Sequence, residues 1–225
     1  MPKKVTKVLP QAFADRDSSA RPDVCEAVAV RRALPFLALA ALVVALVIGL
    51  TQAGGGTEDD AGSSRSLSDL REAVAGAPAP IAALYDEAPN RVVASSAGDF
   101  RERVRALRGH PVVVNVWGSW CGPCKAEFPY FQEAVRRRGR DVAFLGINIL
   151  DNTKNAEEFL ETHPVPYPSL EDGNGAITRE AAPGVRGAPH TIFFDADGER
   201  VLVHQGQYKR LADLLADIDE YAGVA

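Results

Sequence analysis

Residues 111–124 read PVVVNVWGSWCGPC and decide the fold. The first half of this stretch is rich in β-branched residues without regular alternation, which predicts a central strand covered on both faces. Residues 124–138 follow with the composition of a helix. Cys121 and Cys124 are therefore expected where a buried strand passes through a short loop into a helix.

The two cysteines are placed for thiol chemistry. At the first turn of a helix, free backbone N–H groups and the positive end of the helix dipole stabilise a thiolate, which makes Cys121 the predicted nucleophile. Cys124 lies one helical turn later, within reach of a mixed disulfide formed at Cys121. Pro123 fits the first helical turn because no backbone donor is wasted there. We expect Trp120, Gly122 and Pro123 to form the surface that a substrate meets, with the indole shielding the pair.

A metal site is the alternative interpretation of the cysteine pair. A zinc site needs two further Cys or His ligands. The third cysteine, Cys25, lies far away near the N-terminus, and the histidines are scattered singly at His110, His163, His190 and His204. We therefore predict a redox-active dithiol and disulfide with neither a metal ion nor another cofactor, and an incidental reduced thiol at Cys25.

The bulk composition is that of a globular protein, with 46% hydrophobic and 24% charged residues. The 225 residues suffice for one domain of ordinary size plus additional segments. A formal net charge of −5 offers no basic field for a phosphate backbone, so nucleic acid is not expected as a partner.

Further segments extend the sheet and its helical cover. The patterns predict a buried strand at residues 142–148, a hairpin of residues 192–195 and 201–204, and helices between Asp99 and Gly109, at 156–162 and at 211–221. Pro129 should kink the helix that follows the cysteines. This order of elements predicts an α/β fold in which helices cover both faces of a central sheet.

An apolar run near the N-terminus indicates a membrane segment. Residues 33–50 read ALPFLALAALVVALVIGL, an uncharged run at the lower edge of the length that crosses a bilayer as a helix. Arg31 and Arg32 precede the run and acidic residues follow it, so the N-terminal side should stay in the cytoplasm. The alternative is a cleaved signal peptide, because residues 51–53 (TQA) resemble a cleavage site.

Four parts are therefore expected along the chain. They are a cytoplasmic tail at residues 1–32, a single transmembrane signal anchor at 33–53, a flexible linker rich in Gly, Ser and acidic residues at 54–76, and a folded domain at 77–225. The folded domain would then lie outside the cytoplasm at the cell membrane.

Two stretches resemble a known family. Residues 114–129, VNVWGSWCGPCKAEFP, closely resemble the active-site segment of the TlpA/ResA/DsbE-like thioredoxins, which are thiol–disulfide oxidoreductases. Residues 185–195, VRGAPHTIFFD, resemble the cis-proline loop and the following hairpin of that family. The resemblance covers about residues 77–222 and implies a thioredoxin fold, in which helices flank a central mixed β-sheet.

The resemblance also implies roles for single residues. Pro189 would be a cis proline beside the cysteine pair that leaves the Ala188 backbone free to pair with a substrate strand; an ordinary loop proline is the alternative. Glu127 matches an acidic residue of the family, and a raised pKa would let it take the proton of Cys124, whereas a solvated helix glutamate would have no such role. His190 departs from the family pattern and is either a structural residue or a residue near the cysteines that biases their pKa values and contacts substrate.

The leading hypothesis is an enzyme that reduces disulfides of extracytoplasmic proteins. The resemblance suggests apocytochrome c thiols as a substrate and a membrane electron donor of the CcdA/DsbD type as a partner. The Gly122-Pro123 dipeptide is the one found in thioredoxin, at the reducing end of the range of this fold. Oxidative folding is the alternative within the enzyme class, and a thiol-based copper chaperone is the alternative outside it.

Overall fold

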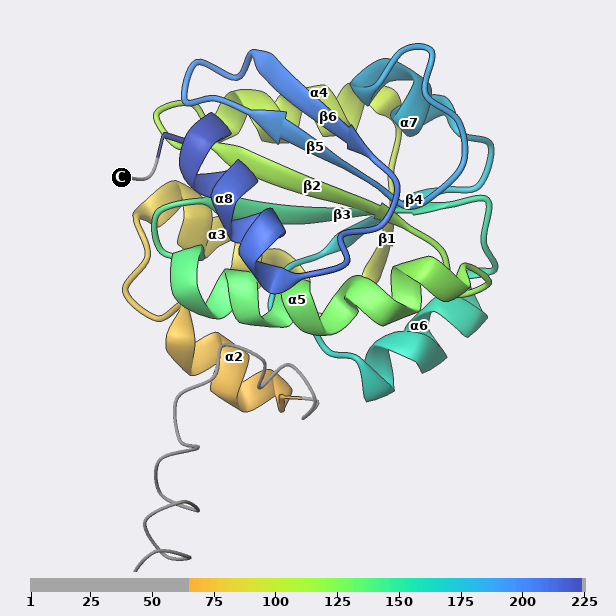
Figure 1. The fold of residues 1–225 in the computed structure, drawn as a ribbon, viewed down its shortest axis with the longest axis horizontal. Helices are drawn as coiled ribbons and strands as arrows, with labels where there is room; N and C mark the ends of the chain where they lie inside the picture. The colour runs from red at the N-terminus through yellow and green to blue at the C-terminus, as the bar shows by residue number, and fades with distance from the viewer. Residues whose placement is uncertain (1–64, 224–225) are drawn as a thin grey trace, which may run out of the picture. The chain divides into compact units, whose positions relative to one another are not determined.

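The computed structural model describes residues 65–223, in which six strands form one mixed sheet in the order β1-β4-β3-β2-β5-β6 (Figure 1). The four strands from β1 to β2 in this order are parallel, and β5 is antiparallel to both β2 and β6. The strands are β1 (Val92–Ala94), β2 (Val112–Trp117), β3 (Ala143–Ile149), β4 (Ser169–Asp172), β5 (His190–Phe194) and β6 (Arg200–Gln205).

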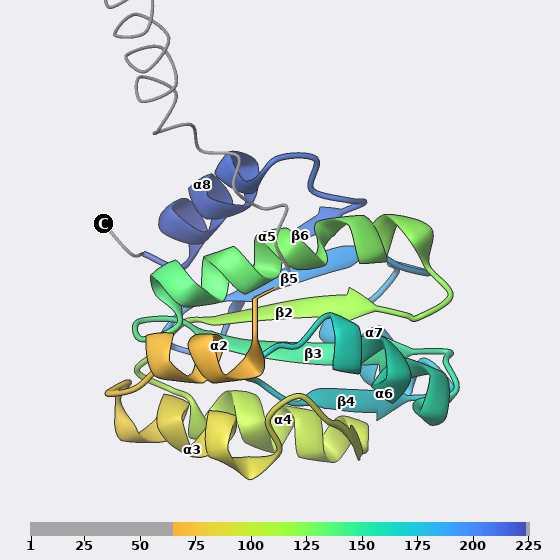
Figure 2. The same cartoon turned by 90° about the horizontal axis from the view of Figure 1, so that it is seen from below.

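Helices cover both faces of this sheet. Side chains of a strand alternate between faces, so Trp117 and Val112 at the two ends of β2 point to opposite sides. Trp117 packs against helices α5 and α6, whereas Phe194, the cross-strand partner of Val112, packs against Phe100 of α4. Helices α5 and α8 lie side by side (Figure 2). The helices are α2 (Leu67–Ala73), α3 (Ala79–Glu87), α4 (Ala97–Ala106), α5 (Gly122–Arg138), α6 (Thr153–Thr162), α7 (Ala176–Ala181) and α8 (Leu211–Tyr221).

Strand β2 is the centre of the fold, and every one of its residues is buried. It pairs with β3 on one side and β5 on the other, and the side chain of Trp117 makes an edge contact with Phe128 and a hydrogen bond to Ser169 Oγ at 3.1 Å. The expected buried strand and sheet covered on both faces are confirmed, and the arrangement is the thioredoxin-like fold that the family resemblance implies. Strand β2 ends at Trp117, and the loop that follows it leads to Cys121.

Helix α2 lies within the stretch expected to be a flexible linker, residues 54–76, so that expectation is wrong for residues 67–73. Ser66 and Asp69 form a reciprocal capping box that satisfies free donors at the helix start. Leu70 is fully buried, and the helix packs against α5. The folded part of the chain therefore includes α2, ahead of the expected boundary at residue 77.

Strands β1 and β4 and helix α7 were not expected, because three to six residues are too few to display a period. Pro80 lies in the first turn of α3, where a proline is accommodated. Helix α5 continues past Pro129, and the kink expected there stays a prediction.

The expected transmembrane anchor, residues 33–53, and the cytoplasmic tail, residues 1–32, lie outside the described residues. Among residues 65–223, no helix has both the length and the apolar character needed to cross a bilayer.

Candidate active site

The cysteine pair occupies the junction of β2 and α5. Cys121 and Cys124 form a disulfide with their Cα atoms 5.3 Å apart, and both residues are buried. Cys121 is the N-cap residue of α5, and its sulfur accepts a hydrogen bond from the backbone N–H of Cys124 at 3.2 Å. This donor and the positive end of the helix dipole would stabilise a thiolate at Cys121 when the disulfide is reduced.

Trp120 lies beside the pair and is 54% exposed. Its indole Nε1 donates to the carbonyl oxygen of Ile149 at the end of β3, at 3.3 Å. Pro123 stands in the first turn of α5, and Gly122 is exposed. The indole therefore presents an apolar surface next to the cysteines while one end of its ring is fixed to the sheet.

The Ala188–Pro189 peptide bond is cis, as the family resemblance implies. Pro189 immediately precedes β5, whose first residue pairs with Val116 near the end of β2, so the cis bond and the cysteine loop lie at the same end of two neighbouring strands. The Pro189 carbonyl accepts from the Gly206 N–H at 3.1 Å, and within residues 65–223 the backbone of Ala188 makes no hydrogen bond. A substrate strand can therefore pair with Ala188.

Glu127 lies on α5 one turn after Cys124 and is fully buried. Residues three apart on a helix are neighbours on one face, so the carboxyl group and the Cys124 sulfur share a side of α5. Its Oε2 accepts from the Tyr208 N–H at 3.0 Å, while Oε1 has no partner in the described residues. Burial raises the pKa of Glu127 to about 8, although the Tyr208 N–H lowers it in part.

A carboxyl group with this pKa is suited to exchange protons with a thiol. The ordinary pKa of a cysteine thiol is about 8.5, so transfer between Cys124 and Glu127 would be nearly balanced in free energy. The alternative of a solvated helix glutamate does not hold, because the side chain is buried.

Asn115 is buried in β2, where its side chain shares the α5 face with Trp117. Neither its amide nitrogen nor its amide oxygen has a hydrogen-bond partner among the described residues. Its cross-strand neighbour Thr191 is also buried, with an unpartnered hydroxyl group. Two neighbouring strands of the core, β2 and β5, therefore each carry an unpartnered polar side chain.

His190 is 1% exposed, and the expected contact of its side chain with substrate stays a prediction. Position 190 begins β5, where its backbone is paired with both β2 and β6. Burial lowers the pKa of His190, opposed in part by the Gly187 backbone, which favours the neutral imidazole.

Asp151 is a site residue that the sequence analysis missed. Its carboxylate accepts from the backbone N–H and the hydroxyl of Ser119, from the Asn148 amide at 2.9 Å and from the Asn152 N–H at 2.8 Å. Ser119 precedes Trp120, so these bonds fasten the loop that carries Cys121 to the end of β3. The sequence feature that could have indicated Asp151 is its position as a polar residue just after the predicted buried strand at residues 142–148.

No group of three or more His, Cys, Asp or Glu side chains in the described part of the chain could hold a metal ion. The paired sulfurs at the start of α5, with a buried carboxyl group one turn away, support thiol–disulfide exchange.

Comparisons with known proteins agree with this chemistry. Residues 83–218 match the family model described as Redoxin. The chain is 38% identical over 93 residues to the thiol:disulfide interchange protein DsbE of Vibrio cholerae, covering 41% of this chain and 48% of that protein. It is 31% identical over 176 residues to the protein of the same description in Yersinia pestis, covering 77% of this chain and 82% of that protein. The match thus spans about half of the Vibrio relative and most of the Yersinia relative.

Among solved structures, DsbF of MTB in mixed oxidised and reduced forms aligns with a TM-score of 0.48 and 26% identity, over 52% of this chain and 85% of that one.

Proposed function

The chain belongs to the Redoxin family and is a thiol–disulfide oxidoreductase, and from this premise we propose that it is a membrane-anchored enzyme that reduces disulfides of extracytoplasmic proteins. The observation that carries the proposal is the Cys121–Cys124 disulfide at the start of α5, beside an exposed indole and at the same end of the sheet as the cis bond before Pro189.

The reaction begins with the reduced pair. The Cys121 thiolate attacks one sulfur of a substrate disulfide, which forms a mixed disulfide and releases the first substrate thiol. The ionised form of Glu127 takes the proton of the Cys124 thiol, and the Cys124 sulfur attacks the Cys121 sulfur, which releases the second substrate sulfur as a thiolate. Glu127 passes this proton to one substrate sulfur and solvent protonates the other, so the substrate gains two electrons and two protons. The enzyme is left with the Cys121–Cys124 disulfide that the structure contains.

Two residues prepare the substrate for this attack. The free backbone of Ala188 pairs with an extended segment beside the substrate cysteine, and the cis bond before Pro189 sets its direction. The exposed part of Trp120 covers the apolar side of the incoming chain and keeps water from the mixed disulfide.

The direction of electron flow is supported by the Gly122-Pro123 dipeptide between the cysteines. The attacking and leaving abilities of the two thiols depend on the groups around them, and this dipeptide is the one found in the strongly reducing thioredoxin. The alternative direction is oxidative folding, in which the Cys121–Cys124 disulfide would accept electrons from substrate thiols.

Membrane attachment is supported by the apolar run at residues 33–50 and the arginines before it. An enzyme in this position needs electrons from across the membrane, for which a donor of the CcdA/DsbD type is the chemically suitable partner. Apocytochrome c is one substrate that would use such reduction, because haem attachment needs free thiols.

A trapping experiment tests the proposal. Cys124→Ala removes the resolving thiol, so a substrate attacked by Cys121 should remain attached as a mixed disulfide, whereas the double variant Cys121→Ala/Cys124→Ala should trap nothing. Mass spectrometry of the adducts from membranes identifies the substrates, and protease treatment of intact cells reports the side on which the domain lies. Adducts absent from Cys124→Ala, or tight stoichiometric Cu(I) binding without reductase activity, would contradict the proposal.

A further inference from the structure

A cavity of about 290 Å³ lies next to the cis-proline loop. One wall is formed by Ile149 and Leu150 at the end of β3, and the other by Val185, Arg186 and Gly187, which lead to Ala188. Trp120 is hydrogen-bonded to Ile149, so the cavity adjoins the surface beside the cysteine pair. Its volume is at the lower limit of small-molecule pockets and suits one or two side chains of a bound polypeptide.

Leu150 gives this cavity an apolar edge. It is 56% exposed and has a φ of +49°, a conformation that is uncommon for a residue with a branched side chain. The same leucine lines a second cleft that Trp120 also lines, so an exposed apolar side chain is shared between the cavity and the cleft beside the indole.

The charges on the wall of the cavity have one sign. Arg179 and Arg186 are both exposed, and none of the residues that line the cavity is acidic. Arg179 donates one hydrogen bond to the Asn174 carbonyl, and Arg186 makes no hydrogen bond or ion pair within residues 65–223. Two guanidinium groups without a carboxylate partner stand out in a chain whose net charge is −5.

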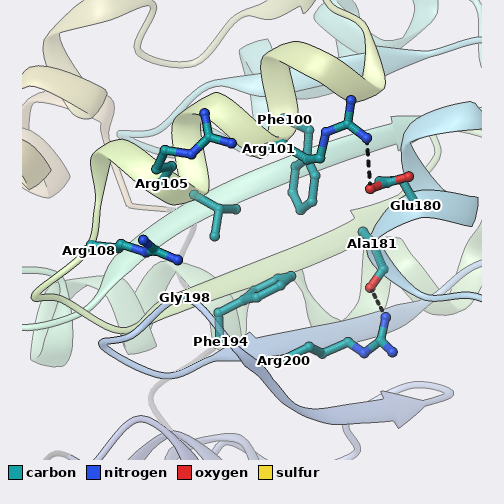
Figure 3. A pocket seen from close by; sticks show the side chains of 10 residues that line it. Phe100, Arg101, Arg105, Arg108, Glu180, Ala181, Phe194, Gly198 and Arg200 are labelled. Atoms are coloured by element: carbon teal, nitrogen blue, oxygen red, sulfur yellow. Dashed lines mark hydrogen bonds and ion pairs between the residues drawn. The ribbon is translucent and has the colours of Figure 1, made fainter.

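A larger group of arginines lies elsewhere and does not serve the cysteines. Arg101, Arg105, Arg108 and Arg200 surround a cavity of about 220 Å³ between α4 and the hairpin of β5 and β6 (Figure 3). Phe194 on its wall pairs with Val112 at the start of β2, whereas Cys121 follows the end of β2. The side chain of Arg105 in this group makes no hydrogen bond or ion pair within residues 65–223, so its substitution is a control for the loss of an arginine outside the cavity beside the cis-proline loop.

We propose that the cavity beside the cis-proline loop is a substrate subsite that selects an acidic side chain close to the attacked cysteine. The inference rests on the proposed function. A substrate strand paired with Ala188 runs past Gly187, and extended chain advances about 3.3 Å per residue, so a side chain within about three residues of the substrate cysteine reaches Arg186 and Arg179. Its methylene groups contact Leu150 and Val185, and its carboxylate lies between the two guanidinium groups.

Short peptides with one intramolecular disulfide test the subsite. One peptide carries glutamates beside a cysteine, and the other carries glutamines at the same positions. The full 225-residue chain is reduced beforehand, freed of reductant and mixed with each peptide, and the loss of peptide disulfide is followed by chromatography. We expect about fivefold faster reduction of the glutamate peptide at low salt, falling toward equality near 0.5 M salt.

Three variants locate the preference. Arg179→Gln/Arg186→Gln should remove it, and Arg186→Gln alone should reduce it, a substitution that breaks no hydrogen bond or ion pair within the described residues. Arg105→Gln, in the distant arginine group, should leave both rates unchanged. Equal reduction of the two peptides by the parent chain, or a preference that survives the double variant, overturns the subsite while the reductase function stands. Failure to reduce either peptide overturns the function and the subsite together.

Discussion

Replacing Glu127 by Gln should change how the stability of the domain depends on pH. The side chain is fully buried, and its pKa is raised by burial from 4.5 to about 8. Between these two pH values the folded protein holds a proton on Glu127 that the unfolded chain releases. The free energy of unfolding of the parent therefore falls as the pH rises through this window. Glutamine has nearly the same shape, can accept from the Tyr208 N–H, and does not titrate.

The size of the effect follows from the two pKa values. Each pH unit in the window is worth about 1.4 kcal/mol, so the whole shift corresponds to about 5 kcal/mol, of which about 3 kcal/mol has been lost at pH 7. The difference in unfolding free energy between Glu127→Gln and the parent should thus rise by about 3.5 kcal/mol from pH 5 to pH 8.

Urea unfolding of the oxidised chain measures this difference. Both tryptophans, Trp117 and Trp120, lie in the folded part, so indole fluorescence follows its unfolding. Oxidised protein is used so that the cysteines do not titrate. A difference that stays constant within about 0.5 kcal/mol from pH 5 to pH 8 would refute the raised pKa and with it the role of Glu127 as proton acceptor.

Glu133 on the same helix supplies the control. Its burial raises the pKa, but hydrogen bonds from Arg136 and Arg137 outweigh burial and hold the pKa at about 2. Above pH 5 this carboxylate is ionised in both the folded and the unfolded chain. Glu133→Gln should therefore shift the unfolding free energy by an amount that does not vary over the same window. In the reduced enzyme only Glu127→Gln should slow disulfide reduction, by about a hundredfold at neutral pH.

Three further substitutions test separate parts of the account. Asp151→Asn weakens the bonds that fasten the loop before Cys121 and should lower the unfolding free energy by about 2 kcal/mol; a loss below about 0.5 kcal/mol in urea would mean that the loop is held by other contacts. Leu70→Ala should cost about 3 kcal/mol and Glu72→Ala less than about 0.5 kcal/mol, and equal effects in thermal melts would show that α2 is not packed. Trp120→Ala should raise KM for a protein substrate more than it lowers kcat, and an unchanged KM would remove the indole from the docking surface.

The long and strongly patterned parts of this fold could be predicted from the sequence. The β-branched run became β2, and α8 begins and ends at Leu211 and Tyr221 as its amphipathic pattern indicates. Short elements could not be predicted in the same way. β1 has three residues, and its place beside β4 is decided by pairing with segments far along the chain.

The cysteine site was predictable because its residues lie close together in sequence. Cys121, Cys124 and Glu127 lie within two turns of one helix, and the cis bond follows from the family resemblance. Asp151 was not found, because its partnership with Ser119 arises only when β3 lies beside β2. The burial of His190 was equally hidden, since it depends on the packing of segments far apart in the sequence.

The reduction potential of the Cys121–Cys124 pair tests the central claim most directly. The full chain is equilibrated with glutathione or dithiothreitol buffers of defined ratio, and the fraction of disulfide is counted after alkylation of free thiols. If the protein is a reductase, we expect a reduction potential near that of thioredoxin, about −270 mV. A value near the −120 mV of a dedicated disulfide donor would contradict the claim and assign the same cysteines to oxidation.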